Sequence, residues 1–389
     1  MQKNGHSCIP SRSLGTQAWG HLCPNGCATA WSAKTCFRTS AETSTMTYKC
    51  GIIGVSGGRA NGHADAYAHI PRCSLACIAT RNRDNLDAFG QRWNVDARYT
   101  DYREMFEREK PDLVHVNTPP DVRLEVMQAA EAAGVGALII EKPLAIQAED
   151  YLAIRSFANT AKVKVAINHQ LHFHPRRSRL QALVHDGAIG TVRLIDASAR
   201  MNMAYQGTHV LQSVAAFHPQ RQPAGIFAQI SGGNGLQEGR KQHYAPDATL
   251  AAVRYGDGAS TLLRCGTNAP YVLAGDERVN VHKQVTVYGT DGYVHWSMWG
   301  WETSLRGKRE RGSHNYPDED ILGQAAMTEA AFDWLEDDGR LHPLNLDAAL
   351  LDFHILLKAY MSGLNRREET LASDLQPGLI EALRQTLVG

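Results

Sequence analysis

Glycines follow a short apolar run near the start of the chain, in the stretch GIIGVSGGRANGHADAY at residues 51–67. A glycine-rich turn between a strand and a helix lets backbone amides approach a diphosphate, and the helix N-terminus favours negative charge. The stretch departs from the G-x-G-x-x-G pattern, because Ser56 and Arg59 stand at its second and third glycine positions. We interpret it as a working variant of a dinucleotide site, with Arg59 either pairing with phosphate or lying on the surface. Its expected ligands are Gly54, Ser56, Gly57, Gly58 and Arg59.

The segment Thr80-Arg81-Asn82-Arg83 follows the second apolar run. A site specific for NAD is expected to offer Asp or Glu here, about twenty residues beyond the glycines. This chain instead has hydroxyl and guanidinium groups, which would bind a 2′-phosphate. Thr80 and Arg81 therefore predict NADP as the preferred cofactor, with NAD as the other possibility. The alternative interpretation is that Arg81 and Arg83 belong to a solvated loop.

Two further polar motifs come directly after apolar runs: Asn117-Thr118-Pro119-Pro120 and Glu141-Lys142-Pro143. Open α/β sheets bind their ligands at the carboxyl ends of parallel strands, which is where both motifs are expected to lie. A lysine at such a position can donate to a substrate oxygen and stabilise a developing alkoxide. Taken alone, Glu-Lys-Pro is also typical of an ordinary exposed loop. The site residues predicted from these motifs are Thr118, Pro119, Glu141 and Lys142.

Several of these motifs resemble, in order, the Gfo/Idh/MocA family of oxidoreductases. The resemblance covers roughly residues 47–200 and rests on the glycine turn, YTDYREMF, NTPPD, AAEAAGVGALIIEKPLA and GAIGTVRLI. It implies a Rossmann domain followed by an α/β domain with an antiparallel sheet, through which members often oligomerise. It also implies hydride transfer between NAD(P) and a carbon of a sugar, cyclitol or related polyol. The implied catalytic residues are Lys142 and His209.

The family's third motif normally carries two aspartates around a glycine and the catalytic histidine. The corresponding stretch AYQGTHVLQ keeps Gly207 and His209 but has Tyr205 and Gln212 at the aspartate positions. A carboxylate beside His209 would raise its basicity, so its loss puts the direction and efficiency of the reaction in doubt. We expect Tyr205 to serve as a proton donor or hydrogen-bonding group and Gln212 only to orient the substrate. Without the resemblance, a lone histidine is more often a structural residue.

The predicted mechanism has His209 take the hydroxyl proton while Lys142 polarises the same oxygen. The other substrate hydroxyls are expected to contact Tyr205, His172, Arg176, Gln206 and Gln212. Two alternatives remain open: an NAD-dependent glycoside hydrolase of the same fold, and a non-catalytic NADP-binding regulatory protein. No metal is expected, because the spacing of His169, His172 and His174 does not place all three on one face.

Alternating strands and helices are needed to position these motifs. Continuous apolar runs at 50–55, 75–79, 113–117, 137–140 and 163–167 are typical of parallel strands covered on both faces. The intervening segment 119–134 predicts a helix that buries Val122, Val126, Ala129 and Ala133 and ends at Gly134. The pattern predicts a doubly wound parallel sheet of the Rossmann type.

The pattern changes after about residue 170. Alternating stretches at 194–202, 250–266 and 284–297, with turn signals at 256–258 and 289–292, predict a large, mostly antiparallel open sheet with helices on one face. The sequence therefore predicts three parts, with the active site in the crevice between the second and third. They are a disordered leader at 1–46, a NAD(P)-binding domain at 47–168, and an α+β domain at 169–389 for substrate binding and oligomerisation.

The bulk composition narrows the classes of protein. Forty basic and forty acidic residues give no net charge to attract nucleic acid or a membrane surface. No apolar run is long enough to span a bilayer, and the eight scattered cysteines are typical of a reducing compartment. We expect a cytoplasmic enzyme with a small-molecule substrate that forms a homodimer or homotetramer through its C-terminal sheet. Met46 is an alternative start of the protein, and in that case residues 1–45 are not part of it.

Overall fold

The computed structural model describes residues 47–237, 243–267, 269–270 and 282–389. The leader predicted at 1–46 lies outside the described residues. Thr45–Gly389 forms one compact unit, so the predicted boundary at residue 168 stays a prediction. Within this unit the chain builds two sheets, one from its first part and one from its second.

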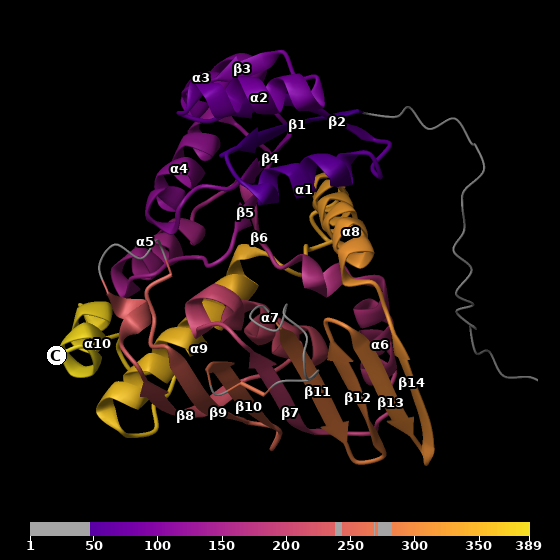
Figure 1. Cartoon of the computed structure of the whole chain (residues 1–389), viewed down its shortest axis with the longest axis vertical. Coiled ribbons are helices and arrows are strands. Elements are labelled where there is room, and N and C mark those ends of the chain that lie inside the picture. Colours follow the sequence, from indigo (N-terminus) through magenta and orange to yellow (C-terminus); the bar gives the residue numbers. More distant parts are fainter. Residues whose placement is uncertain (1–46, 238–242, 268, 271–281) are drawn as a thin grey trace, which may run out of the picture. The chain divides into compact units, whose positions relative to one another are not determined.

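The first sheet has six parallel strands in the order β3-β2-β1-β4-β5-β6, which confirms the predicted Rossmann-type arrangement. Its central strands are buried at all but one residue each of β1 and β5, because helices cover both faces (Figure 1). The short edge strand β3 was not predicted; its three residues are only half-buried and give no apolar run. The strands are β1 Tyr48–Ile53, β2 Cys73–Ala79, β3 Ala97–Tyr99, β4 Leu113–Val116, β5 Ala137–Glu141 and β6 Lys164–Asn168.

Five α-helices connect these strands: α1 Gly58–Tyr67, α2 Arg83–Trp93, α3 Tyr102–Glu109, α4 Arg123–Ala133 and α5 Ala148–Ala158. Helix α4 ends at Gly134 in the left-handed conformation, as predicted. Its buried face, however, is rotated from the predicted stripe. Only Val126 is shared, and the other buried residues are Arg123, Met127 and Ala130. The charged Arg123 was not expected inside, and it turns out to contact the candidate site.

The second sheet has eight strands in the order β14-β13-β12-β11-β7-β10-β9-β8. All neighbouring pairs are antiparallel except β7 and β10, so the predicted sheet is confirmed together with both hairpins. The strands are β7 Val192–Ala199, β8 Pro223–Ser231, β9 Ala248–Tyr255, β10 Ser260–Gly266, β11 Lys283–Gly289, β12 Gly292–Ser297, β13 Gly300–Leu305 and β14 Lys308–Ser313.

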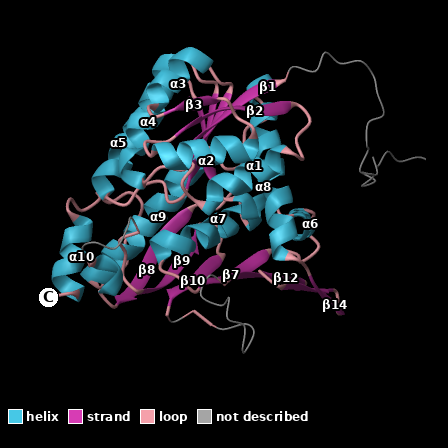
Figure 2. Cartoon of the chain, turned by 45° about the horizontal axis from the view of Figure 1, so that its top comes forward, coloured by secondary structure: helices cyan, strands magenta, loops and turns pink. Residues whose placement is uncertain are grey.

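Helices lie on one face of this sheet, between it and the parallel sheet (Figures 1 and 2). Helix α8 crosses back to the first part of the chain, where Phe332 stacks on Tyr48 at 4.3 Å between ring centroids. No described helix is long and apolar enough to cross a membrane. The helical elements of this part are η2 Gln170–Phe173, α6 Pro175–His185, η3 Met203–Gly207, α7 Thr208–Phe217, η4 Asn234–Leu236, α8 Tyr316–Glu336, α9 Leu346–Asn365 and α10 Leu379–Leu387, with the short turn η1 Pro120–Val122 in the parallel half.

Candidate active site

The glycine turn has one position that requires glycine and two that leave space. Gly54 ends β1 with φ of 83°, and a Cβ there would lie 2.9 Å from the carbonyl oxygen of Asn117. A Cβ on Gly57 or Gly58 would meet nothing within 4 Å. Helix α1 begins at Gly58 without a side-chain cap, so its first amides are not satisfied by a capping side chain. This open helix N-terminus fits a diphosphate.

The end of β2 lies beside this turn, as the cofactor prediction requires. The Gly54 amide donates to the Ala79 carbonyl at 2.8 Å, and the Asn85 amide donates to the Ser56 hydroxyl at 3.0 Å. Thr80 is half-buried, whereas Arg81 is exposed. In the described parts of the chain, Arg81 forms no ion pair. Thr80 and Arg81, which are predicted to select the cofactor, therefore lie at the same edge of the sheet as the glycine turn.

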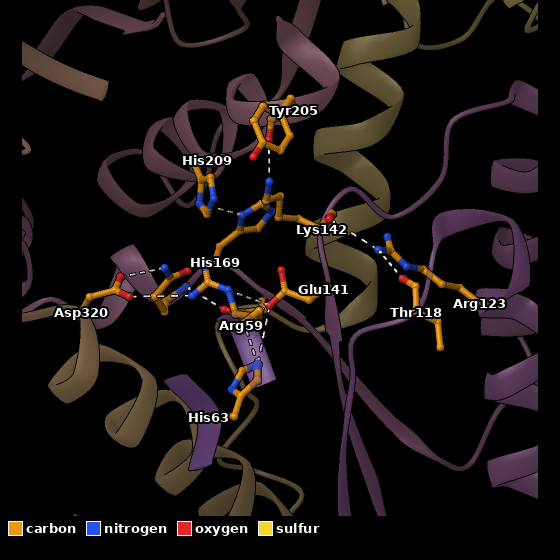
Figure 3. A network of polar contacts seen from close by, with 12 residues as sticks. Arg59, His63, Thr118, Arg123, Glu141, Lys142, His169, Tyr205, His209 and Asp320 are labelled. Carbon is orange, nitrogen blue, oxygen red and sulfur yellow. Dashed lines mark hydrogen bonds and ion pairs between the residues drawn. The ribbon is translucent and has the colours of Figure 1, made fainter. Parts of the chain in front are cut away.

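Arg59 lies within ion-pair distance of two carboxylates from other elements. Its guanidinium lies 3.4 Å from the Glu141 carboxylate and 3.7 Å from that of Asp320 on α8 (Figure 3). Glu141 also accepts a hydrogen bond from Asn168 at 2.5 Å and lies 3.6 Å from His63. Burial raises the pKa of Glu141, but Arg59 and His63 outweigh it and lower the pKa to about 2. Arg59 thus links α1, β5 and α8, and its predicted phosphate contact stays a prediction.

Lys142 follows β5 and is 8% exposed. Its Nζ donates to the backbone carbonyl of Tyr205 at 2.8 Å and lies 4.3 Å from the centre of the Tyr205 ring (Figure 3). Burial, together with the charges of Arg59 and Arg123, lowers the pKa of Lys142 to about 8, although Glu141 opposes this shift. An amine with this pKa can both donate and accept a proton near neutral pH.

Arg123 supports the loop behind Lys142. Its Nη2 donates to the carbonyls of Thr118 at 3.3 Å and Lys142 at 3.4 Å. The predicted pair Thr118 and Pro119 lies between β4 and η1, and the Thr118 hydroxyl is buried with no hydrogen-bond partner. Arg123 therefore ties together the turns after β4 and β5, which are the two strand ends predicted to hold ligands.

His209 lies in the first turn of α7 and faces His169, which begins the turn η2. The Nδ1 atoms of the two rings are 3.4 Å apart (Figure 3). Burial and nearby positive charge lower the pKa of His209 well below its ordinary value, and burial lowers that of His169 to about 3. Both imidazoles are therefore neutral at physiological pH. His209 is positioned as a neutral hydrogen-bonding group rather than as a strong base.

Gln212 lies three residues after His209, on the same face of α7. Its amide nitrogen lies 2.8 Å from Nδ1 of His172, and its carbonyl oxygen accepts from Arg177 at 3.3 Å. Of the predicted substrate residues, Gln212 and His172 are therefore brought together near His209. Arg176 is not: its guanidinium stacks on Trp301 at 4.4 Å, whereas the adjacent Arg177 points into the interior.

A cavity of about 510 Å³ joins the two halves of the site. It extends from the glycine turn to residues that follow the second sheet's first strand, such as Tyr205 and Gln206. The side-chain oxygen of Gln206 accepts a hydrogen bond from Lys283 at 3.0 Å. Within the described ranges, no group of three potential ligands could hold a metal ion. The cavity is lined by Gly58, Arg59, Gly62, Glu141, Lys142, Tyr205, Gln206, His243, Asp320 and Gln324.

Residues 48–169 match the model of the Gfo/Idh/MocA oxidoreductase family, which has a NAD-binding Rossmann fold. The match covers 122 of the 389 residues, so this part of the chain is similar to that family. A D-apiose dehydrogenase of Paraburkholderia graminis is 28% identical over 153 residues, which are 39% of this chain and 40% of that protein. An inositol 2-dehydrogenase of Rhizobium meliloti is 24% identical over 155 residues, or 40% and 46% of the two chains. The chain thus spans less than half the length of these curated relatives.

Solved structures of oxidoreductases extend the similarity in fold to both halves of the chain. A levoglucosan dehydrogenase in complex with NADH has a TM-score of 0.68 at 16% identity, covering 84% of this chain and all of its own. An oxidoreductase from Agrobacterium radiobacter, in complex with NAD+, L-tartaric acid and magnesium, has a TM-score of 0.70 at 17% identity, covering 83% and 98%. At these identities the likeness shows the fold alone.

Sequence reasoning missed several residues of the candidate site. Arg123, Arg177 and Lys283 are buried cations, and Asp320 is the carboxylate that holds Arg59 from α8. Arg177 was not predicted, because it stands next to Arg176 in the sequence. The two side chains differ only in their direction from α6, and the sequence alone does not show which of them points inward. Asp320 and Lys283 come from parts of the chain more than 140 residues beyond Glu141, so no local pattern connects them to the site.

Proposed function

We propose that the protein is an NAD(P)-dependent oxidoreductase that interconverts a hydroxyl and a carbonyl carbon in a sugar, cyclitol or related polyol. The observation that carries this proposal is a single cavity that is lined both by Gly58 of the phosphate turn and by the amine of Lys142. The family match of residues 48–169 and the names of the relatives support the same reaction class. Neither alternative function predicted from the sequence is favoured by a particular feature of the site.

The residues around the glycine turn fit a nicotinamide dinucleotide. The open amides at Gly57 and Gly58 would hold the diphosphate, and Thr80 with Arg81 would hold the adenosine ribose. Because Arg81 is exposed and no carboxylate occupies the selector segment 80–83, we propose a preference for NADP. Thr118 and Pro119 would lie beside the other ribose. When bound, the cofactor supplies the hydride acceptor or donor.

Lys142 is the residue that we propose moves the proton. In oxidation its neutral amine takes the proton of the substrate hydroxyl, and in reduction its ammonium returns one to the carbonyl oxygen. The sequence prediction gave this role to His209, but the lowered pKa of that imidazole favours Lys142 instead. His209 would then hold the substrate oxygen as a neutral hydrogen-bonding group, with its ring oriented by His169.

Tyr205 and Gln206 occupy the wall of the cavity from the side of the second sheet. The backbone carbonyl of Tyr205 fixes the position of the lysine Nζ, so this contact does not depend on the side chain that replaces the expected aspartate. Gln206 accepts from Lys283 and keeps its amide group at the cavity. We propose that both residues contact substrate hydroxyls and that Tyr205 also shields the amine from water.

The test combines cofactor binding with a substrate screen. NADPH and NADH are titrated by fluorescence, and polyols are screened by nicotinamide absorbance in wild type, Lys142→Ala and His209→Ala. We expect tighter NADPH binding and turnover that Lys142→Ala abolishes and His209→Ala reduces. Turnover unaffected by Lys142→Ala would refute the assigned role. Cofactor binding without turnover across the screen would favour the regulatory alternative, and release of an aryl leaving group without net cofactor reduction would favour the hydrolase.

The uncovered face of the second sheet supports the predicted homo-oligomer. Large apolar side chains on four of its strands are exposed on this face, opposite the helices. Exposed apolar surface of this kind is typical of protein interfaces. We propose that a second copy of the chain covers it. The exposed residues are Leu194 on β7, Phe227 on β8, Leu250 on β9 and Tyr288 on β11.

A further inference from the structure

Arg177 is a buried cation whose charge is not balanced by any carboxylate of the described residues. It is the third residue of α6, and its side chain is 0% exposed. Its Nη2 donates to the neutral Gln212 at 3.3 Å, while Nε and Nη1 have no hydrogen-bond partner. Its guanidinium also lies 5.4 Å from the ring of Trp296. A buried guanidinium needs an anion or several acceptors, because removing it from water without them costs several kcal/mol.

The carboxylates near α6 are engaged elsewhere. Glu319 lies 3.1 Å from His314 and 3.8 Å from His174. Asp320 accepts from Gln170 at 2.7 Å and lies within ion-pair distance of Arg59 and His174. In the described parts of the chain, no ion pair joins Arg177 to a carboxylate. Consistent with this, burial lowers the pKa of Arg177 to about 9, with only the phenol of Tyr316 opposing it.

Gln212 is the reason that Arg177 keeps its charge unbalanced. A carboxylate at this position would form an ion pair with Arg177, because Gln212 Oε1 already lies 3.3 Å from its Nη2. The amide of Gln212 instead accepts one hydrogen bond from Arg177 and contacts His172 at 2.8 Å. Gln212 thus positions the guanidinium without neutralising it.

Arg177 also lies close to the reacting centre. His209 and Gln212 are three residues apart on α7, so they share one face at a spacing of about 5–6 Å. Each faces one histidine of the same short segment: His169 opposite His209 at 3.4 Å, and His172 opposite Gln212 at 2.8 Å. Arg177 therefore contacts the residue of α7 that lies one helical turn from His209.

We propose that the substrate carries an anionic group, a carboxylate or a phosphate ester, and that Arg177 binds this group. The fork of an arginine matches both groups through paired N–H donors. This inference rests on the proposed function, since it names the class of polyol that the same site accepts. It gives Gln212 a role in specificity, because its neutrality leaves the charge of Arg177 available for the substrate.

The experiment compares three matched ligands that differ in charge: D-gluconate, D-glucose 6-phosphate and neutral D-glucitol. Binding is measured as the rise in melting temperature of the NADPH-loaded protein, and turnover is measured separately with either oxidised cofactor. We expect one of the two anions to raise the melting temperature and to exceed D-glucitol at least tenfold in kcat/KM. A response to gluconate alone identifies a carboxylate, and a response to the phosphate ester alone identifies a phosphate.

Two variants test whether Arg177 causes the preference. Arg177→Gln is expected to lose at least tenfold in the ratio of anionic to neutral kcat/KM, while the exposed Arg179→Gln on the same helix keeps the ratio. Arg177→Gln removes a buried group and could fail to fold, so Gln212→Glu provides a second route. Its carboxylate would neutralise Arg177 in place, and the same loss of preference is expected in a folded protein.

The outcomes separate the two proposals. Turnover of D-glucitol with no response to either anion would overturn the anionic-substrate inference and leave the oxidoreductase proposal standing. An unchanged preference in Gln212→Glu would overturn the role of Arg177. Anion binding that depends on Arg177 in a protein that binds no dinucleotide would support the anion site while refuting the proposed function.

Discussion

The proton-transfer role of Lys142 makes a quantitative prediction about pH. Burial lowers its pKa from the ordinary 10.5 to about 8. This shift corresponds to about 3 kcal/mol, since one pKa unit is about 1.4 kcal/mol. At pH 7.5 roughly a quarter of the amines are then neutral, against about one in a thousand for an unperturbed lysine. The fold therefore increases the active base by more than about a hundredfold near neutral pH.

The direction of the pH effect follows from the protonation state that each reaction needs. Oxidation needs the neutral amine, so kcat/KM is expected to rise from pH 6 and level off above about pH 8. Reduction needs the ammonium, so its kcat/KM is expected to fall through the same pH range. The measurement is a pair of pH profiles, with NADPH binding followed at each pH so that changes in cofactor affinity are separated from proton transfer.

Two variants identify the group that titrates. Lys142→Arg replaces the amine with a guanidinium that stays protonated over this range, so the limb near pH 8 should disappear with most of the activity. His209→Asn should lower the rate but keep the limb. A limb near pH 8 that survives Lys142→Arg, or one that moves with His209→Asn, would show that the proton is carried elsewhere.

Three further predictions concern the cofactor, the glycine turn and the open sheet face. Arg81→Asp should weaken NADPH binding about 10–100-fold, the value of one or two charged hydrogen bonds, while NADH binding changes little; equal losses for both cofactors would contradict the selector role. Gly54→Ala should lower the melting temperature by several degrees, because a side chain at φ of 83° is strained and meets Asn117. Gly57→Ala should keep the melting temperature unchanged and weaken NADPH binding, because its added Cβ meets no protein atom. Phe227→Lys should shift the protein toward monomer in sedimentation experiments, and Leu322→Lys, at an equally exposed apolar residue of α8, should not.

The sequence predicted those parts of the fold whose signals are local. Continuous apolar runs identified five of the six parallel strands, and the glycine turns at 256–258 and 289–292 identified two hairpins. Helix α8 was not predicted, because its position depends on packing against α1 and η2 rather than on its own pattern. The rotated face of α4 has a similar origin, since Arg123 is buried by its contacts with the turns after β4 and β5.

The site shows the same division between local and distant signals. The rule that ligands bind at the carboxyl ends of parallel strands correctly grouped the glycine turn with the motifs around Thr118 and Lys142. The orientation of Arg59 was not accessible in this way, because it depends on Asp320, which lies 261 positions further along the chain. The protonation states were equally inaccessible, since burial is the largest influence on the pKa of both Lys142 and His209.

The two missing aspartates have a consequence that neither position reveals alone. With Tyr205 and Gln212 in their place, no carboxylate of the described residues lies beside His209, so burial keeps its imidazole neutral and leaves Lys142 as the group whose pKa matches proton transfer. The same replacement leaves Arg177 without an ion pair. Loss of negative charge therefore moves proton transfer to the lysine and makes the pocket attractive to an anion. If this coupling is correct, Gln212→Asp should reduce the preference for anionic substrates and raise the pKa of His209 together, and a change in only one of them would refute the common cause.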